Sequence, residues 1–377
     1  MYEKLLAIDT PAAIIDHTRM QSNIRRMQQR MDALGVHFRP HVKTSKCTPV
    51  VLAQLAAGAR GITVSTLKEA RHFFAVGITD ILYAVGISPD KLPQVHALRQ
   101  SGCNLKIITD NAETAHAIAD FCQAQECKLE VWIEIDCDGH RSGIAPEDPA
   151  LLEVAHQLAA CPALLGGVMT HAGSSYGCQT PEALAAIAEQ ERAGCVRAAE
   201  RLRAAGFPCP NVSVGSTPTA LGALHLDGVT EVRAGVYVFF DLVMHNVGVC
   251  RQEDIALAVL TTVIGHQRDK GWAIVDAGWM AMSRDRGTQK QAQDFGYGQV
   301  CELDGTPLPG YVVHDANQEH GIIASRQGDS DIASVFPIGR RLLILPNHAC
   351  ATGAQFPEYH CLQSNGECQT WPRLHGW

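Results

Sequence analysis

The chain has 377 residues, of which 46% are hydrophobic and 19% are charged, and its formal net charge is −8. This composition is typical of a globular enzyme with a large core, and the negative charge argues against nucleic acid as a general partner. The N-terminal residues contain no apolar signal segment, and the longest apolar run, 255–264, is too short to span a membrane. The fourteen cysteines are scattered and form no CxxC pair. We therefore expect a cytoplasmic protein with free thiols and no membrane partner.

Eight short apolar or β-branched runs follow one another through the first two-thirds of the chain, and longer helical patterns separate most of them. The runs cover 36–42, 61–64, 80–84, 105–108, 129–135, 165–170, 212–214 and 230–233. The helical patterns cover 66–76, 89–100, 112–124, 149–159 and 181–205. Such alternation predicts parallel βαβ units. Eight strands are the number that closes a (β/α)8 barrel of the TIM type.

Two regions do not fit this barrel. The run 12–15 comes before the first barrel strand and makes a ninth. After about Leu242 the pattern changes to short strands separated by Gly, Asp and Asn turns, at 255–264, 272–275, 311–313, 341–344 and 367–371. This second pattern predicts an antiparallel β domain. We place the barrel at residues 11–243 and the β domain at 244–377.

A lysine ends the first barrel run. Lys43 lies in the segment RPHVKTSK, residues 39–46, and the loops at the C-terminal ends of barrel strands are where such barrels carry chemistry. An amine there can form a Schiff base with a carbonyl cofactor. A lone lysine is more often a solvated surface residue, so the assignment depends on what lies beside it. Polar segments also follow the fifth to eighth runs, at 134–143, 170–176, 215–219 and 233–237.

The loops after the seventh and eighth runs are the usual phosphate site of a barrel. Gly215, Ser216, Thr217 and Gly235 supply backbone N–H groups, two hydroxyls and no bulky side chain. A phosphate site and a lysine at the same barrel mouth suit pyridoxal 5′-phosphate. The sequence contains neither GxGxxG nor GxxxxGK[ST], so nothing supports a dinucleotide.

A second cluster lies in the β domain, where His348 and Cys350 are separated by one residue. On an extended segment this spacing points both side chains to one side. An imidazole and a thiolate favour zinc over magnesium or calcium. Structural zinc sites use four protein ligands, so a two-ligand pair makes sense only for an open, catalytic ion.

Several motifs together resemble the fold-type III pyridoxal-phosphate enzymes, the group that includes alanine racemase. The chain is most similar to the D-serine dehydratase and D-threonine aldolase family. The resemblance extends over nearly the whole chain, and the motifs occur in the family's order: RPHVKTSK, DGHRSG, THAGSSY, VGSTPT, EVRAGVYVFFD, VDAG, NQEHG and PNHACATGAQFP.

The resemblance implies roles for single residues and for the first strand. It implies that Lys43 is the Schiff-base lysine, that the strand within 11–16 joins the β domain, and that the protein is a homodimer. The cofactor residues that it implies are Arg141, Tyr176, Ser216, Thr217, Gly235 and Tyr237. The metal ligands that it implies are His348 and Cys350, with zinc favoured and manganese, cobalt or magnesium as alternatives. Arg233 matches the racemase position that faces the pyridine nitrogen; the alternative is an ion pair with Glu231 or a neighbouring strand.

The reaction implied is loss of water from a D-3-hydroxy amino acid. The resemblance favours D-threo-3-hydroxyaspartate as the substrate, which would give oxaloacetate and ammonia, and D-serine is the next candidate. A second substrate carboxylate needs a cation, for which Arg284 and Arg286 are candidates unless they lie in a solvated loop; Gln318 and His320 are candidates to line the same site. The alternatives are a D-threonine aldolase, a racemase that needs no metal, and a non-catalytic carrier of pyridoxal phosphate.

Overall fold

The structure, a computed structural model, describes residues 2–160, 165–328 and 331–377. Contacts between residues divide the chain into two compact units. The barrel unit comprises Met27–Lys43 and Val51–Gly235, together with Trp377, and the β unit comprises the residues up to Arg26, Thr44–Val50 and Val236–Gly376. The chain therefore changes unit between Lys43 and Thr44, and again after Gly235.

The barrel unit contains one sheet of eight parallel strands in the order β2-β9-β8-β7-β6-β5-β4-β3. These strands are β2 (His37–Pro40), β3 (Ile62–Val64), β4 (Asp80–Gly86), β5 (Asn104–Thr109), β6 (Glu130–Ile135), β7 (Leu165–Thr170), β8 (Asn211–Val214) and β9 (Glu231–Ala234). A parallel bridge between His41 and Thr63 joins the two ends of this order, and the Val42 N–H donates to the Thr63 carbonyl at 2.9 Å. The predicted (β/α)8 barrel is confirmed, with each strand at the run that predicted it.

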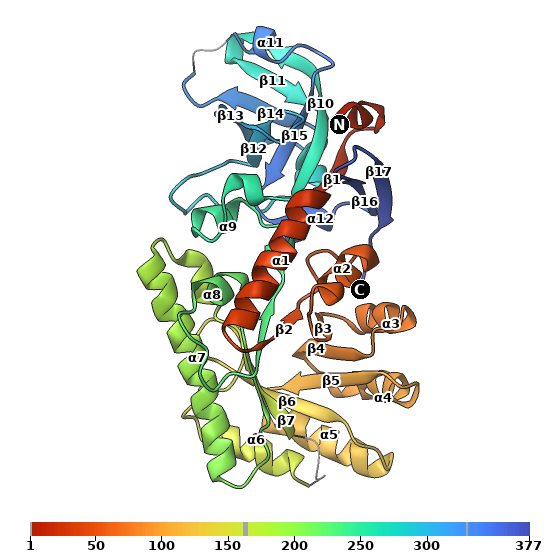
Figure 1. Ribbon diagram of the computed structural model, residues 1–377, viewed down its shortest axis with the longest axis vertical. Helices are drawn as coiled ribbons and strands as arrows, with labels where there is room; N and C mark the ends of the chain where they lie inside the picture. The colour runs from red at the N-terminus through yellow and green to blue at the C-terminus, as the bar shows by residue number, and fades with distance from the viewer. Residues whose placement is uncertain (1, 161–164, 329–330) are drawn as a thin grey trace. The chain divides into compact units, whose positions relative to one another are not determined.

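Helices follow most of the barrel strands and surround them, as the view of the lower part of the molecule shows (Figure 1). They are α3 (Leu67–Ala75), η2 (Pro89–Lys91), α4 (Leu92–Gln100), α5 (Ala112–Ala124), α6 (Ala150–Leu158), η3 (Gly173–Gly177), α7 (Pro181–Ala204) and α8 (Thr217–Gly222). Three of them begin at a polar capping residue: the side chains of Thr66, Asn111 and Thr180 each accept the backbone N–H three residues further on, at the start of α3, α5 and α7. Two further helices, α1 (His17–Ala33) and α2 (Thr48–Ala56), have residues in both units.

Large apolar side chains from neighbouring strands pack together in the barrel unit. Leu82 of β4, Ile108 of β5, Trp132 of β6 and Met169 of β7 form one cluster in which no side chain is more than 3% exposed. Burial of this kind stabilises each large side chain by about 1.5–3 kcal/mol. The strands, and the residues just after them, are therefore held rigidly.

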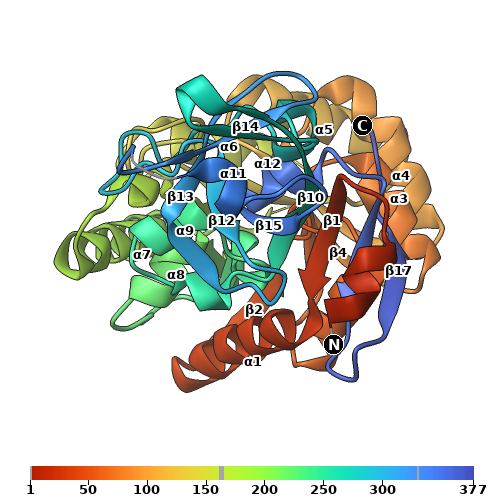
Figure 2. The same ribbon diagram turned by 90° about the horizontal axis from the view of Figure 1, so that it is seen from above.

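The β unit contains a nine-stranded sheet in the order β11-β14-β13-β12-β15-β10-β1-β16-β17. Its strands are β1 (Ala12–Asp16), β10 (Leu257–Gln267), β11 (Trp272–Val275), β12 (Gly298–Cys301), β13 (Pro307–Ala316), β14 (Gly321–Ser325), β15 (Arg341–Pro346), β16 (Glu358–Leu362) and β17 (Cys368–Pro372). The N-terminal strand β1 pairs antiparallel with β10 and parallel with β16, and it lies beside β10 in Figure 2. The predicted β domain with mainly antiparallel strand pairing is confirmed.

Short helices connect the strands of the β unit. They are η1 (Tyr2–Ala7), η4 (Val236–Val238), α9 (Leu242–Asn246), η5 (Gln252–Asp254), η6 (Arg268–Lys270), α10 (Trp279–Met282), α11 (Ile332–Val335) and α12 (Ala349–Gly353). None of the helices formed by the described residues combines the length and the apolar character that a membrane crossing requires.

Candidate active site

Lys43 lies in the turn that follows β2, and its side chain is exposed. Its backbone N–H points toward the Nδ1 atom of His41, 3.5 Å away. The bridge between His41 and Thr63 holds the start of this turn against β3. Lys43 therefore lies at the C-terminal end of a barrel strand, as the sequence predicts.

Two half-buried histidines, His41 and His171, lie close to three cations, one of which is Lys43. Burial lowers the pKa of His41 well below its usual value, and the charges of Lys43, Arg233 and Arg141 lower it further. Burial also lowers the pKa of His171 to about 3, and the same three cations act in the same direction. Both imidazoles are thus neutral at pH 7, and the structure brings Lys43, Arg141 and Arg233 to one end of the barrel.

His171 follows β7 directly and is fixed in one tautomer. Its Nδ1 atom lies 3.1 Å from the Gly215 carbonyl oxygen. Because a carbonyl can only accept, the proton is on Nδ1 and the lone pair is on Nε2. The ring also contacts Tyr176 of η3, with the ring centroids 6.1 Å apart. Tyr176 therefore lies beside the same histidine, and Arg141 lies nearby with its Nη2 atom 3.6 Å from Glu134 Oε1.

The predicted phosphate loop after β8 is built around a glycine and a group of buried hydroxyls. Gly215 has φ +128°, and a Cβ atom there would lie 2.2 Å from the Arg233 carbonyl oxygen, so only glycine fits. Ser216 caps α8: its Oγ atom accepts the Thr219 N–H, and its own N–H donates to Thr219 Oγ1 at 3.0 Å. Ser216 Oγ also lies 3.0 Å from Ser175 Oγ, after β7.

The remaining predicted cofactor residues are divided between the units. Thr217 is the buried first residue of α8, and Gly235 follows β9 directly. Tyr237 is fully buried in η4 and belongs to the β unit. Arg233 lies on β9 and donates from Nη1 to Ser213 Oγ at 2.5 Å and from Nη2 to the Thr170 carbonyl at 2.6 Å. Glu231 forms its ion pair with Arg39. The direct Arg233–Glu231 ion pair, which the sequence analysis gave as an alternative, is therefore not formed.

The residues at this end of the barrel fit pyridoxal 5′-phosphate. An exposed primary amine suits its carbonyl, and a turn that only glycine can form lets backbone approach a phosphate. Three cations, Lys43, Arg141 and Arg233, would compensate the negative charge of the ligand. The two histidines beside them are neutral and do not add to the positive charge.

The candidate metal pair lies in the β unit, just after β15. His348 precedes α12 and has extended backbone angles, whereas Cys350 lies in the first turn of α12. The sequence prediction of a fully extended segment is therefore wrong. The reason is local: Ala349 and Ala351 favour helix, and the Asp241 carboxylate accepts the Ala349 N–H at 2.9 Å at the start of that helix.

His348 is nevertheless directed toward Cys350. Its Nδ1 atom lies 2.6 Å from Asp285 Oδ2. Burial disfavours a charge on His348, but the hydrogen bonds with Asp285 and Cys350 outweigh this and raise its pKa to about 11. The hydrogen bond with His348 in turn lowers the pKa of Asp285. An imidazole whose one nitrogen is held by a carboxylate offers its other nitrogen to a metal, as histidine ligands commonly do.

Cys350 has a second neighbour, since its Sγ atom lies 3.1 Å from the Oγ1 atom of Thr44. Among the described residues there is no group of three or more His, Cys, Asp or Glu side chains that could hold a metal. The donor set of His348 and Cys350 thus fits an ion that keeps other coordination positions for water or substrate, and it does not fit a closed structural zinc site.

The residues predicted to bind a substrate carboxylate differ in their exposure and in the contacts that they already make. Arg284 is exposed, with its guanidinium 4.6 Å from the centroid of the Trp279 ring. Arg286 is half-buried and paired with Asp294 at 3.1 Å. Gln318 and His320 are exposed, and the Gln318 carbonyl accepts the Met280 N–H at 3.1 Å. Met280 belongs to α10, so this hydrogen bond ties the Gln318 segment to the helix that ends just before Arg284.

Sequence reasoning missed three residues at these sites, two half-buried histidines and one buried glutamate. His41 and His171 each stand directly after a barrel strand, so the rule that selected Lys43 could have selected them. Glu191 had no such signal, because it lies within the long α7 helix and resembles a solvent-facing residue. It is 1% exposed, and it accepts the Ala172 N–H at 2.8 Å. Burial raises the pKa of Glu191, although hydrogen bonds from Thr219, Ala172 and Gly215 oppose this.

Comparison with known proteins covers both units. Residues 15–243 match the model of the alanine racemase N-terminal domain, and residues 256–362 match that of the putative serine dehydratase domain. The chain is 68% identical over 380 residues to D-threo-3-hydroxyaspartate dehydratase of Delftia sp. (strain HT23), with 100% of both chains covered. A solved structure of that enzyme matches with a TM-score of 0.98 and covers 99% of each chain. D-serine dehydratase of Dictyostelium discoideum is 30% identical over 96% of this chain and 95% of its own.

The two matching domain models follow one another in the order that the two sequence patterns predict. The identity to the Delftia enzyme extends over the full length, so the likeness includes the lysine segment and the histidine–cysteine segment alike. The chain belongs to the family of D-threo-3-hydroxyaspartate dehydratase and D-serine dehydratase, lyases of the fold-type III pyridoxal-phosphate group.

Proposed function

We propose that the protein is a D-threo-3-hydroxyaspartate dehydratase, which converts its substrate to oxaloacetate and ammonia with pyridoxal phosphate and a divalent metal. The observation that carries this proposal is the full-length identity of 68% to the Delftia dehydratase. It is supported by the amine, the cations and the glycine turn that lie together at one end of the barrel. We also propose that residues 11–243 bind the cofactor, that residues 244–377 carry the metal, and that the protein works as a homodimer.

The proposed roles in the barrel unit follow from the chemistry of each group. Pyridoxal phosphate, when bound, supplies an electron sink that acidifies the α-carbon of an amino acid. Lys43 is the amine to hold it, and a released Nζ atom can take a proton from the α-carbon as a general base. Ser216, Thr217 and Gly235 would hold the phosphate, and Arg141, Tyr176, Arg233 and Tyr237 would hold the ring.

The proposed roles in the β unit concern the leaving group. A divalent metal, when bound, acts as a Lewis acid on the hydroxyl that departs. His348 Nε2 and Cys350 Sγ are the atoms to hold it, and a thiolate with an imidazole favours zinc over manganese, cobalt or magnesium. D-threo-3-hydroxyaspartate dehydratase, 68% identical to this chain, has been solved with a histidine changed to alanine, and in a metal-free form with a cysteine changed to alanine. Those two residues are separated by one position, as His348 and Cys350 are, which supports the pair as the metal site.

The connection between Lys43 and Thr44 supports the proposal that the cofactor and the metal take part in the same reaction. Thr44 contacts Cys350 and is bonded covalently to Lys43. Consecutive Cα atoms lie about 3.8 Å apart, so the lysine is one residue away from a residue that contacts the proposed metal ligand.

We propose Arg284 as the residue that binds the second carboxylate of hydroxyaspartate. Its guanidinium is exposed and rests on the Trp279 ring, whereas Arg286 is already paired with Asp294. Arginine suits this role because it can bind a carboxylate with two parallel hydrogen bonds. If this is correct, the Arg284→Ala variant should have a higher KM than wild type for D-threo-3-hydroxyaspartate and an unchanged KM for D-serine.

The test is a product assay on the purified protein. The protein with pyridoxal phosphate is incubated with D-threo-3-hydroxyaspartate, D-serine or D-threonine, with and without a chelator. Keto acid, ammonia, aldehyde and the L-enantiomer are all measured. We expect keto acid and ammonia in equal amounts, the highest kcat/KM with D-threo-3-hydroxyaspartate, and loss of turnover in chelator that added zinc restores.

The other outcomes separate the alternatives. Glycine with an aldehyde would identify an aldolase, and the L-enantiomer would identify a racemase. Bound cofactor without turnover of any of the three substrates would identify a carrier. Lys43→Ala and Cys350→Ala should both abolish product, whereas the exposed Lys128→Ala and the half-buried Cys368→Ala serve as matched controls and should retain it.

A further inference from the structure

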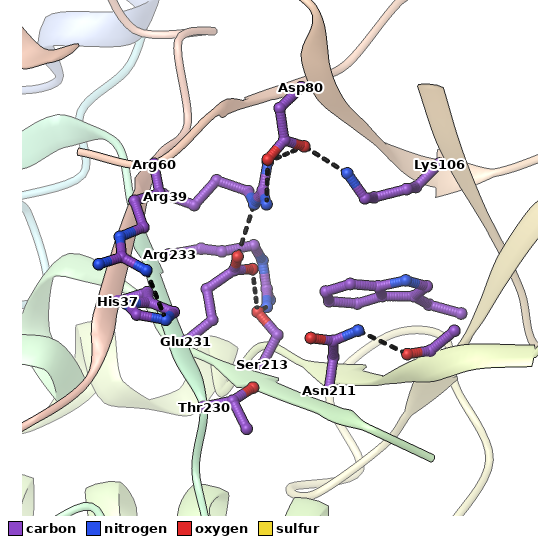
Figure 3. Close-up of polar contacts among 12 residues, drawn as sticks. His37, Arg39, Arg60, Asp80, Lys106, Asn211, Ser213, Thr230, Glu231 and Arg233 are labelled. Carbon is purple, nitrogen blue, oxygen red and sulfur yellow. Dashed lines mark hydrogen bonds and ion pairs between the residues drawn. The ribbon is translucent and has the colours of Figure 1, made fainter. Parts of the chain in front are cut away.

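A chain of polar side chains runs across several strands of the barrel unit (Figure 3). Each member contacts the next, and the chain ends at Arg233 among the cations beside Lys43. In order its members are Lys106 of β5, Asp80 of β4, Arg39 of β2, Glu231 of β9, Ser213 of β8 and Arg233 of β9. We call this set the core polar chain.

The end of the core polar chain farther from Arg233 consists of ion pairs. Arg39 donates to Asp80 with two parallel hydrogen bonds, Nη1 to Oδ1 at 2.9 Å and Nη2 to Oδ2 at 3.2 Å. Lys106 donates to the same carboxylate. The Nε atom of Arg39 donates to Glu231 Oε2 at 2.7 Å. Arg39, Lys106 and Glu231 are all buried, so their orientations are determined by these partners.

The other end passes through one hydroxyl. Ser213 Oγ lies 2.8 Å from Glu231 Oε1, and because a carboxylate only accepts, the hydroxyl proton points to Glu231. The oxygen of Ser213 is then left to accept Nη1 of Arg233 at 2.5 Å. The Thr170 carbonyl accepts Nη2 of Arg233 at 2.6 Å. Both Nη atoms are therefore held, and the plane of the guanidinium is fixed.

Charge is unevenly balanced along the core polar chain. It contains three cations and two carboxylates. Glu231 accepts a hydrogen bond from Arg39 directly and is linked to Arg233 through the hydroxyl of Ser213. Burial lowers the pKa of Arg233, and Glu231 is the carboxylate that opposes this most, ahead of Glu191 and Glu134. Glu231 thus favours the charged form of Arg233, and the positive charge of Arg233 in turn lowers the pKa of His41 and His171.

We propose that Ser213 and Glu231 are positioning residues for Arg233, fixing the direction and the charge that its guanidinium presents to the cofactor. In this role neither residue would contact the cofactor, and both would act through Arg233. The inference rests on the proposed function, in which Arg233 holds the ring of pyridoxal phosphate. It predicts that cofactor affinity and cofactor electronics depend on a serine and a glutamate within the barrel strands.

The test uses holoenzyme and the variants Ser213→Ala, Ser213→Thr and Glu231→Gln. Asn211→Ala is the matched control, because Asn211 lies on the same strand and donates to the Gly166 carbonyl at 2.7 Å instead of to the core polar chain. Three quantities are measured: the dissociation constant of pyridoxal phosphate, the pH midpoint of the visible absorption band of the bound cofactor, and turnover. The first two do not depend on the reaction.

We expect Ser213→Ala and Glu231→Gln to weaken cofactor binding about tenfold, the loss typical of one hydrogen bond to a charged group. Both should also shift the pH midpoint of the visible band. Ser213→Thr keeps the hydroxyl and should restore both quantities. Asn211→Ala should leave both at the wild-type value, whatever it does to the unfolding temperature.

Wild-type affinity and an unchanged band in both Ser213→Ala and Glu231→Gln would overturn the proposal. If Ser213→Thr behaves like Ser213→Ala, packing and not the hydroxyl is responsible, and the proposal is equally wrong. Should Ser213→Ala fail to fold, Glu231→Gln decides the matter alone. Altered cofactor affinity in a protein that turns over none of the substrates would sustain the positioning role and reject the proposed function.

Discussion

The Oγ1 atom of Thr44 lies 3.1 Å from the Sγ atom of Cys350. Thr44 is 0% exposed, and it is the first residue of the β unit after the barrel residue Lys43. A buried hydroxyl beside a thiol limits the orientations that the thiol can adopt. The contact makes the environment of the proposed metal ligand depend on the segment that carries the proposed cofactor lysine.

Thr44→Val should weaken metal binding. Valine has the shape of threonine but leaves Cys350 without this partner, and a neutral hydrogen bond contributes about 1 kcal/mol. We expect the zinc dissociation constant, measured by isothermal titration, to rise about fivefold. Thr44→Ser keeps the hydroxyl and is the control. Equal zinc affinity in wild type and Thr44→Val would show that the contact does not orient the thiol.

Asp285→Asn should weaken metal binding more strongly. The carboxylate 2.6 Å from His348 Nδ1 fixes which nitrogen of the ring carries the proton, and loss of such a partner lowers metal affinity by about 10- to 100-fold. Zinc titration checks this directly, without any reaction. Asp269→Asn changes an exposed aspartate of the same unit and should leave affinity unchanged. A ratio below twofold for Asp285→Asn would argue against the orienting role.

Gly215→Ala should disrupt the turn after β8. Its φ of +128° is strained for alanine, and the added methyl would lie 2.2 Å from the Arg233 carbonyl oxygen. We expect the free energy of unfolding to fall by about 3 kcal/mol and pyridoxal phosphate binding to be lost. Gly86→Ala is the matched control, since a methyl there meets nothing within 4 Å. Urea unfolding and fluorescence titration with the cofactor measure the two effects.

The Asp80 carboxylate should make stability depend on pH on the acid side. Burial disfavours its charge, but Arg39 and Lys106 outweigh this and lower its pKa below 3.8. The folded state thus holds the proton less tightly than the unfolded state. The stabilisation is complete above the unfolded pKa of about 3.9 and is lost as the pH falls through the folded value.

Asp80→Asn should therefore be less stable than wild type at neutral pH, and the gap should narrow toward pH 3. Because the Asp80 side chain is 38% exposed, we expect a loss of about 2 kcal/mol at pH 7, less than for a fully buried pair. Urea unfolding at several pH values tests this. A gap that stays constant with pH would assign the loss to shape instead of charge.

The barrel was predictable because its signal is repeated. Each of eight runs is short, apolar and followed by turn residues, and the periodicity changes from two to 3.6 between run and helix. The β unit was harder. Strands β12, β14 and β16 were not predicted, since Gly298–Cys301 has only four residues and Glu358–Leu362 alternates polar and apolar side chains in a pattern too short to stand out.

The sites were predictable where a residue type at a strand end is itself informative. Lys43 and Gly215 are of this kind. The partners of other residues near the sites were not predictable. Asp285 beside His348, Glu191 beside Ala172 and Ser213 beside Arg233 reach their places only through tertiary contacts. Likewise the sequence cannot reveal that Arg39, and not Arg233, is the ion-pair partner of Glu231.

The position of β1 has a consequence for synthesis of the protein. Ala12–Asp16 is synthesised before the other strands described above, yet it is an interior strand whose neighbours, β10 and β16, come much later in the chain. The sheet of the β unit therefore cannot be completed until β16 and β17 have been made, whereas the barrel strands are all available earlier. A nascent or truncated chain that lacks β16 would expose one edge of an apolar strand, which is a site of aggregation. Expression yield should therefore fall sharply when β16 is deleted, although β16 lies far from Lys43 in the sequence.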